Sequence, residues 1–453
     1  MEPQDTFLRK EGKASEEPAT MVAQEKRFQV RESILTTLVE TSFAVRVMYS
    51  YVRALVLVAL LVTSIQYYVM PKVWQSDLSL LQRSFSDMHI IIAYEIIMTT
   101  GLMILLLSAV CIRKCSPLLT YAGVAVTTIF VIAFPLFVRF YFRLHEVMAI
   151  VVVFEQVRYF MKMVSFVVEN MRDPHEQPSA GSFLYFLYAP TLIYQSMYPK
   201  KESRKWKNIA DWSMQLLALI WLTVIVMSRG FLETFSRVGR KDLVAQDYFD
   251  MLQQSFFFAP IVGLSISYAF LHLWLNIWAE LLMFGDRMFY KNWLEAKDSL
   301  QQVSLMNFII HCWIKEYLFL PIAKGTGSKS LAFIASHWAS YLVHDYCICI
   351  PFQIYQFIYT TSMIIFSLAI PVKLLYACCF GKRTQTTTPP APYSNEKGIP
   401  FFCGMMAAFC ICAALFSIRY FEFSNCPDLP FSAFRSFTPF TITGKCQNDH
   451  SPN

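Results

Sequence analysis

Long apolar stretches separated by short polar segments run along most of this chain. A bilayer core of about 30 Å requires roughly 20 apolar residues per helix, so stretches of this length predict membrane-spanning helices. The qualifying stretches are 52–70, 89–112, 118–138, 147–168, 209–228, 256–284, 331–350, 352–380 and 400–418. The pattern therefore predicts an all-α, polytopic membrane protein with about nine transmembrane helices.

A further apolar stretch, 303–323, is interrupted by polar residues. Asn307, His311, Lys315 and Glu316 all fall within it. Polar groups at membrane depth are tolerated where they line a cavity rather than face lipid. We therefore expect this stretch to form a re-entrant or cytosol-side helix beside an internal catalytic tunnel.

The composition is typical of a membrane protein, and the N-terminal residues are polar. Of 453 residues, 55% are hydrophobic and 16% are charged, whereas soluble domains carry about a quarter charged residues. The net charge of +7 is not gathered into a basic block with interleaved aromatics, so nucleic acid is not an expected partner. The chain starts with polar residues of mixed charge and no signal-peptide core, so 1–45 is predicted to be a disordered cytosolic tail.

Basic residues predict the orientation of the chain. They cluster after the second stretch, before the fifth, after the sixth and after the eighth. A cytosolic N-terminus places all four clusters in the cytosol, as the positive-inside rule expects, although the basic residues of 229–250 fall on the other side. The membrane domain then covers 46–420 and the tail 421–453 is lumenal, where Cys426 and Cys446 could form a disulfide.

Two histidine-containing groups are candidates for chemistry. His344 lies within the seventh stretch, in "SYLVHDY", and shares a helix face with His337. His344 could be a general base facing a reaction chamber, or a histidine satisfied by a neighbouring helix. Asn307 and His311, spaced i and i+4, could present an amide and an imidazole to one cavity, or they could join two helices by hydrogen bonds.

Other polar groups in the apolar stretches suggest structural roles. His272, Asn276 and Glu280 form a stripe that stabilises the bundle or lines a tunnel, and Glu155 and Arg158 are spaced to form an ion pair. The sequence contains no HExxH motif, no CxxC pair, no GxSxG motif and no P-loop. We therefore expect neither a metal site nor a bound cofactor.

Three tracts carry a resemblance to a known family: "AFLHLWLNIWAELLMFGDRMFYKNWLEA" (269–296), "FEQVRYFMKMVSFVVEN" (154–170) and "FLYFLYAPTLIYQSMYP" (183–199). They resemble the sterol O-acyltransferase branch, also called acyl-CoA:cholesterol acyltransferases, of the membrane-bound O-acyltransferases. The likeness extends from about residue 150 to 360. In the tail, "CPDLPFSAFRSFTPFTITGKC" resembles the lumenal disulfide loop of the family and implies a Cys426–Cys446 bond.

The resemblance implies a multi-pass enzyme of the endoplasmic reticulum membrane that acts as a dimer or tetramer. Such enzymes transfer a long-chain acyl group from acyl-CoA, a co-substrate rather than a cofactor, to the 3-hydroxyl of a sterol. His344 matches the family's general base, and Asn307 matches an asparagine that orients the thioester or the histidine. Two alternatives stay open: acylation of diacylglycerol or a long-chain alcohol, and a catalytically inactive, sterol-binding relative.

The resemblance also implies residues that bind acyl-CoA. They are His311, Tyr317, Lys329 and Ser340, together with Phe289, Tyr290, Lys291, Asn292 and Trp293 of the FYxDWWN motif. This chain reads "FYKNWLE" there, so the motif's aspartate is replaced by Asn292, and Leu294 and Glu295 also depart from it. Near the first span, Ser50 stands where a sterol-contacting histidine is common. These departures are the main support for the inactive alternative.

Overall fold

The computed structural model describes residues 28–114, 116–172, 178–240, 242–293, 296, 299–354, 360 and 398–425. Across these residues the regular structure is helical, apart from two isolated β-bridges, Arg31 with Asp286 and Lys200 with Phe284. The predicted all-α class is therefore confirmed. The cysteines of the predicted disulfide, Cys426 and Cys446, lie outside the described residues, as does most of the predicted span 352–380.

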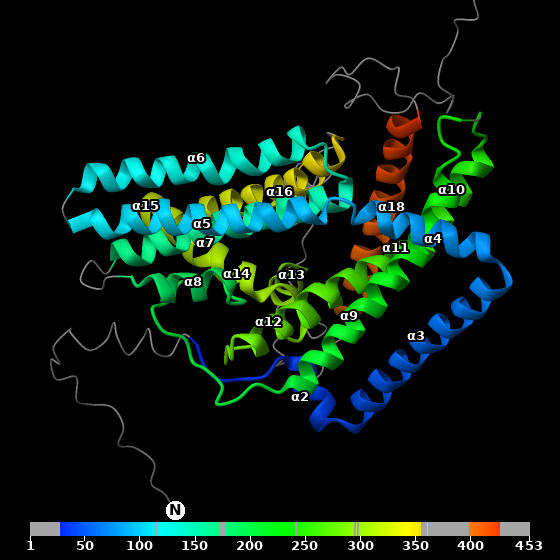
Figure 1. Cartoon of the computed structure of the whole chain (residues 1–453), viewed down its shortest axis with the longest axis horizontal. Helices are drawn as coiled ribbons and strands as arrows, with labels where there is room; N and C mark the ends of the chain where they lie inside the picture. The colour runs from blue at the N-terminus through cyan, green and yellow to red at the C-terminus, as the bar shows by residue number, and fades with distance from the viewer. Residues whose placement is uncertain are drawn as a thin grey trace, which may run out of the picture.

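The helices follow one another along the chain and cross in a single body (Figure 1). Their order is α2 (Ile34–Thr41), α3 (Phe43–Val69), α4 (Pro71–Ser84), α5 (Met88–Cys111), α6 (Pro117–Tyr141), α7 (Glu146–Arg172), α8 (Ala180–Tyr188), α9 (Trp206–Val226), α10 (Glu233–Phe235), α11 (Ala245–Tyr268), α12 (Leu275–Leu281), α13 (Ser299–Met306), α14 (Phe308–Ile314), α15 (Leu320–Thr326), α16 (Lys329–Phe352) and α18 (Gly398–Asn425). A 3₁₀ turn, η1 (Ile112–Lys114), follows α5, and π-helical turns η2 (Met227–Leu232), η3 (Ala269–Trp274) and η5 (Lys315–Phe319) join α9 to α10, α11 to α12 and α14 to α15.

Six helical segments among the described residues are long and apolar enough to cross a membrane. They are Phe43–Val69, Pro71–Cys111, Pro117–Tyr141, Trp206–Phe235, Ala245–Leu281 and Phe402–Asn425. Each overlaps most of one of the predicted stretches. Two further predicted spans coincide with α7 and α16, which have 27 and 24 residues but carry more polar side chains. The structure thus confirms a polytopic membrane protein.

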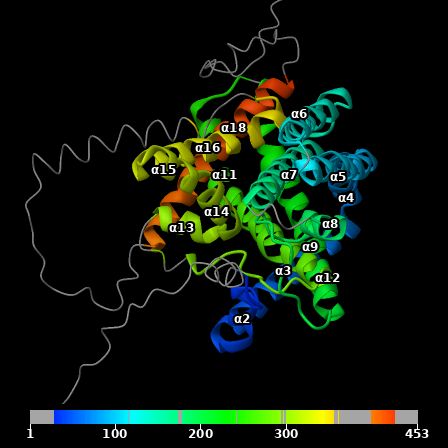
Figure 2. The ribbon, with the colours of Figure 1, turned by 90° about the vertical axis from the view of Figure 1, so that its left-hand side faces the viewer.

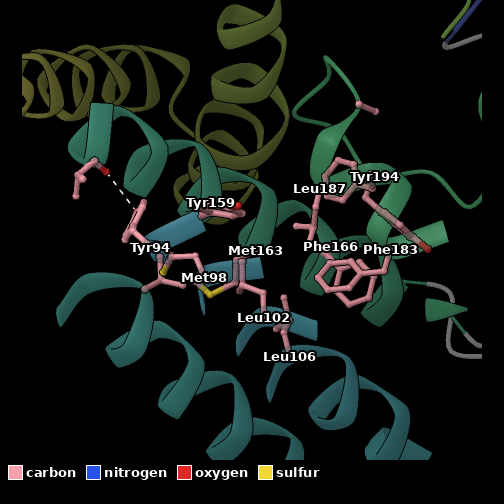
Figure 3. Packing of buried hydrophobic residues seen from close by; sticks show 14 of the residues in the cluster. Tyr94, Met98, Leu102, Leu106, Tyr159, Met163, Phe166, Phe183, Leu187 and Tyr194 are labelled. Carbon is pink, nitrogen blue, oxygen red and sulfur yellow. Dashed lines mark hydrogen bonds between the residues drawn. The ribbon is translucent and has the colours of Figure 1, made fainter. Parts of the chain in front are cut away.

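The largest apolar core forms where α7 packs against α5, α6 and α8. Figure 3 shows Tyr94, Met98, Leu102 and Leu106 of α5, spaced one turn apart, lying beside Met163 of α7. Because lipid is as apolar as these side chains, close packing rather than exclusion of water holds membrane helices together. Side chains in this core, such as Met98 and Leu102, are fully buried.

Charged residues of α7 stabilise this core by capping α8. Arg158 pairs with Glu155, as the sequence predicts, and donates a 2.5 Å hydrogen bond to the carbonyl of Leu187. Lys162 donates to the carbonyls of Phe186, at 2.5 Å, and Ala189, at 2.8 Å. The last carbonyls of a helix lack partners within the helix and favour cations, so this arrangement satisfies the C-terminus of α8.

The predicted disordered tail is too long. Residues 28–33 form an extended segment, α2 begins at Ile34 and α3 begins at Phe43, so 28–45 is ordered. Residues 1–27 lie outside the described part of the chain. In Figure 2, α2 lies at the lower edge of the body, while α13 to α16 gather on the left and α5 and α6 on the right.

Candidate functional site

Asn307 lies at the break between α13 and α14. Its backbone is non-helical, with φ −127° and ψ 76°, and its Oδ1 accepts a 3.4 Å hydrogen bond from the N–H of Ile310, so it caps α14. Asparagine is a favoured N-cap because its side-chain oxygen satisfies a backbone donor of the first turn. With Oδ1 on the helix, the NH₂ group lies on the other side of the amide and can donate outward.

The FYKNW tract, 289–293, lies against this break. The N–H of Phe308 donates to the carbonyl of Phe289 at 3.1 Å, and the N–H of Lys291 donates to the carbonyl of Leu305 at 2.8 Å. The ammonium of Lys291 lies 3.9 Å from the ring centre of Phe308. Two backbone hydrogen bonds and a cation–π contact therefore join the predicted acyl-CoA tract to the chain on both sides of Asn307.

The aromatic side chains of the tract have different surroundings. Phe289 is buried in the large apolar core. The Tyr290 hydroxyl lies 2.8 Å from Nδ1 of His272, and burial raises its pKa above the ordinary value. Trp293 packs on Phe402 of α18, with ring centres 5.0 Å apart. Asn292 is half-buried, while the structure does not describe Leu294 and Glu295. The first two aromatics therefore anchor the tract, and Lys291 lies at its partly exposed side.

His311 is the exposed imidazole one turn after Asn307. Its pKa is lowered from the ordinary value, first by partial burial and then by the positive charges of Lys315 and Lys291 and by His337. These side chains come from α14, η5, the FYKNW tract and α16. They form a basic cluster, defined here as Lys291, His311, Lys315 and His337, beside the α13–α14 break.

The histidines of α16 are held in one tautomer by the helix itself. Nδ1 of His344 lies 2.7 Å from the carbonyl oxygen of Ser340, and Nδ1 of His337 lies 2.8 Å from that of Phe333. A carbonyl oxygen can only accept, so Nδ1 carries the hydrogen in each ring. In a neutral imidazole the other nitrogen, Nε2, is then the basic one. His344 is exposed within the described structure.

A tight helical turn brings α16 back along α15 and η5. Gly327 ends α15 in the left-handed conformation, with φ +68°, and the Ser328 hydroxyl caps α16 by accepting from the N–H of Leu331 at 3.2 Å. The return is antiparallel, so Asn307 and His344 lie in the same direction from the His311–His337 pair. Asn307 is one turn from His311, and His344 is about 10 Å along α16 from His337.

The remaining predicted ligand residues are not all brought together. Lys329 is exposed in the first turn of α16, about 22 Å along the helix from His344. The backbone of Ser340 is engaged by His344. Tyr317 is buried, and its hydroxyl donates to Glu169 of α7 at 2.6 Å. The structure therefore gives Tyr317 a structural contact and places it away from the exposed face of α14.

A buried ion-pair network stands directly before the FYKNW tract. Glu280, 1% exposed, pairs with Arg287, which is 0% exposed, and accepts from the N–H of Lys205 at 2.7 Å. The predicted stripe of His272, Asn276 and Glu280 is accordingly buried in the bundle. Arg287 was not predicted as a site residue, although an arginine beside a buried acid in "GDRMFY" is the signal that points to it. Among the described residues, no group of three His, Cys, Asp or Glu side chains could hold a metal ion.

Sequence comparison connects this arrangement to known proteins. No protein-family model matches the chain. Sterol O-acyltransferase 2 of Homo sapiens is 30% identical over 248 residues, which are 52% of this chain and 46% of the human protein. The rat protein of that name, from Rattus norvegicus, is 31% identical over 226 residues, 48% of this chain and 43% of its own. Sterol O-acyltransferase 1 of Macaca fascicularis is 29% identical over 232 residues, 48% and 42% of the two chains.

The fold and these similarities define the class of protein. The chain is a multi-pass, all-α membrane protein. Within that class its relatives are the sterol O-acyltransferases, which confirms the resemblance carried by its three tracts. The matched region covers less than half of the length of each of these relatives.

Proposed function

We propose that this protein is an acyl-CoA-dependent sterol O-acyltransferase of the endoplasmic reticulum membrane, with a cytosolic N-terminus. It transfers a long-chain acyl group to the 3-hydroxyl of a sterol and releases a steryl ester and coenzyme A. The observation that carries the proposal is the tautomer of His344, whose Nδ1–H is bound to Ser340 so that Nε2 is the basic nitrogen. Similarity to sterol O-acyltransferases supports the choice of substrates.

In the proposed reaction His344 acts as the general base. Its Nε2 accepts the hydroxyl proton as the sterol oxygen attacks the thioester carbonyl. The carbon–sulfur bond then breaks, and the coenzyme A thiolate takes up the proton. The transfer is direct, with no acyl-enzyme intermediate. Asn307 donates through its NH₂ group to the oxygen on which charge develops, a contribution of about 10²–10³ in rate for one such donor.

Acyl-CoA is proposed to approach along the basic cluster. Lys291 and Lys315 supply positive charge near His311, one turn from Asn307, and Lys329 supplies another at the start of α16. Phosphates of a ligand arriving from water are attracted to such a cluster. Trp293, two residues after Lys291, packs on Phe402 of α18. The acyl chain is proposed to reach His344 from this side.

Two other readings remain as outcomes of the test. Diacylglycerol or a long-chain alcohol could replace the sterol, because the same base and asparagine would serve any lipid alcohol. A sterol-binding relative without activity is favoured by the FYKNWLE departure from the family motif. Asn292 keeps an amide where the motif has a carboxylate, and the tract still pairs with 305–308 by backbone hydrogen bonds.

The test uses microsomes from cells that lack sterol esterification, supplied with labelled oleoyl-CoA and cholesterol. We expect steryl ester from the wild type and a loss of at least about 100-fold in His344→Ala and in Asn307→Ala at equal expression. His89→Ala is the control, since His89 is an exposed histidine in the first turn of α5 and belongs neither to the proposed base nor to the basic cluster. Label in triacylglycerol or wax ester would show that the acceptor is diacylglycerol or a long-chain alcohol. A well-expressed wild type that forms no ester would favour the inactive, sterol-binding relative.

A further inference from the structure

The extended segment before α2 is built into the molecule. The N–H of Arg31 donates to the carbonyl of Gly285 and the N–H of Arg287 donates to the carbonyl of Arg31, both at 3.0 Å. On its other side, Gly285 donates to the carbonyl of Pro199 at 2.8 Å. Residues 283–287 therefore lie between the N-terminal segment 28–33 and the loop 199–201, with backbone hydrogen bonds on both sides.

Side chains fasten the same segment by charge. The guanidinium of Arg31 binds both oxygens of Asp286, at 2.6 and 2.8 Å, in the bidentate geometry that is strongest for this pair. Asp286 also accepts from the N–H groups of Gln29, at 3.3 Å, and Met288, at 3.2 Å. Glu32 pairs with Lys201 and lies 3.5 Å from Arg287. Six polar contacts thus meet on a short length of chain.

Apolar and hydroxyl contacts complete the attachment. The ring of Phe28 packs edge-on against Tyr198, with centres 5.3 Å apart, and against Phe284, at 6.2 Å. Ser33 is fully buried, and the amide of Asn276 in α12 donates to its hydroxyl at 3.5 Å. The segment therefore contacts both α12 and the chain directly before the FYKNW tract.

A continuous path of contacts leads from this segment to Asn307. Asp286, held by Arg31, lies three residues before Phe289, whose carbonyl receives the N–H of Phe308. Lys291, two residues further, donates to Leu305. Leu305, which accepts one of these hydrogen bonds, and Phe308, which donates the other, flank Asn307. Displacing 285–288 would displace both hydrogen bonds that hold the break at which Asn307 caps α14.

We propose that residues 28–33, termed the N-terminal latch, position the catalytic asparagine and Lys291 by holding the tract 285–291. The latch itself touches no substrate, so Arg31 is a positioning residue. This inference rests on the proposed acyltransfer and deepens it, since it assigns to a polar segment outside the membrane helices a role in the geometry of the site. A misplacement of about 1 Å costs up to about 100-fold in rate when reacting groups must be aligned.

The first part of the test is a double-mutant cycle on ester formation. We expect Arg31→Ala to lower kcat by about 10-fold or more, and Arg31→Lys to recover part of the loss. If Arg31 acts through Asn307, Arg31→Ala combined with Asn307→Ala is no slower than Asn307→Ala alone, because residues that act as a unit are not additive. The matched control is Arg53→Ala, which removes a 2.8 Å ion pair to Asp211 that does not include the tract 285–291. Any loss of rate in Arg53→Ala is expected to multiply with the loss in Asn307→Ala.

The second part does not depend on activity. Cysteines at Lys291 and Leu305, which the backbone hydrogen bond brings together, are oxidised in membranes, with each single-cysteine variant as background. Cross-linking is expected to fall at least several-fold in Arg31→Ala and to stay unchanged in Arg53→Ala. Arg31→Gln, which keeps one NH₂ donor group but loses the charge and the two-pronged contact, replaces the alanine variant should the latter fail to accumulate.

The two parts separate the possible failures. Arg31-dependent cross-linking in a protein that forms no ester would overturn the acyltransfer and keep the latch as the element that positions the tract. Equal cross-linking in Arg31→Ala, or a fully multiplicative loss with Asn307→Ala, would overturn the latch while leaving the acyltransfer intact.

Discussion

Two neighbouring regions of the site use charged and titratable side chains in opposite ways. In the tract 280–287 the charged groups are buried and ion-paired, Glu280 with Arg287 and Asp286 with Arg31 of the N-terminal latch. In the hairpin from α14 to α16, His311 and His344 are exposed, and His344 is held through a backbone carbonyl. The first region fixes shape, and the second presents nitrogen atoms to a ligand. A site is precise when its presenting groups stand on a rigid support.

The largest expected effect falls on activity alone. His344→Ala should reduce ester formation by about 10²–10⁴-fold, the range of one general base, because it removes Nε2 from an exposed position. Its thermal midpoint in detergent should stay close to that of the wild type. A loss of folded protein in proportion to the loss of activity would contradict this distinction between the two regions, since His344 would then stabilise the helix bundle.

The opposite result is expected for the buried region. Arg287→Met leaves Glu280 buried without its main partner, and breaking a buried pair in this way costs about 3–5 kcal/mol. Folded protein, measured by fluorescence-detected chromatography after heating, should fall. Adding Glu280→Met should recover part of the loss, because two apolar side chains replace the pair. No recovery in the double variant would mean that Glu280 has a role beyond this pairing, such as its bond to Lys205.

A smaller effect is expected from closing the space beside Gly285. A Cβ at this position would lie 2.7 Å from the backbone oxygen of Pro199 and 3.1 Å from a methyl group of Val30. Gly285→Ala should therefore cost about 1–3 kcal/mol, as overpacking does. Gly325→Ala is the control, because nothing lies within 4 Å of its Cβ and alanine favours a helix by about 1 kcal/mol. Equal thermal midpoints for the two variants would contradict the close approach of the three chain segments.

The membrane-spanning helices could be predicted from local sequence pattern, but contacts between residues far apart in the sequence could not. The spans α3, α5, α6, α9, α11 and α18 are continuous apolar stretches, and the pairing of Glu155 with Arg158 follows from helical spacing. The order of 28–45 was missed because its partners, Asp286 and Lys201, lie far away in the sequence, so nothing in the segment itself signals them. Tyr317 was predicted as a ligand contact from the family resemblance alone, and the hydrogen bond that its hydroxyl donates to Glu169 of α7 could not be read from local pattern.

The smallest predicted effect tests the contact between the two regions. Burial, Lys315, Lys291 and His337 lower the pKa of His311 from its ordinary value of 6.5, so the unfolded chain takes up a proton at this position before the folded protein does. Stability is then unaffected above the ordinary pKa and is lost as the pH falls below it. His311→Gln should flatten the fall of the thermal midpoint between about pH 7 and pH 5, and Lys315→Gln should flatten it less, because burial, the largest cause, remains. Identical pH profiles for the wild type and His311→Gln would mean that neither burial nor the charges of Lys315 and Lys291 act on His311, and that the basic cluster is not a single electrostatic unit.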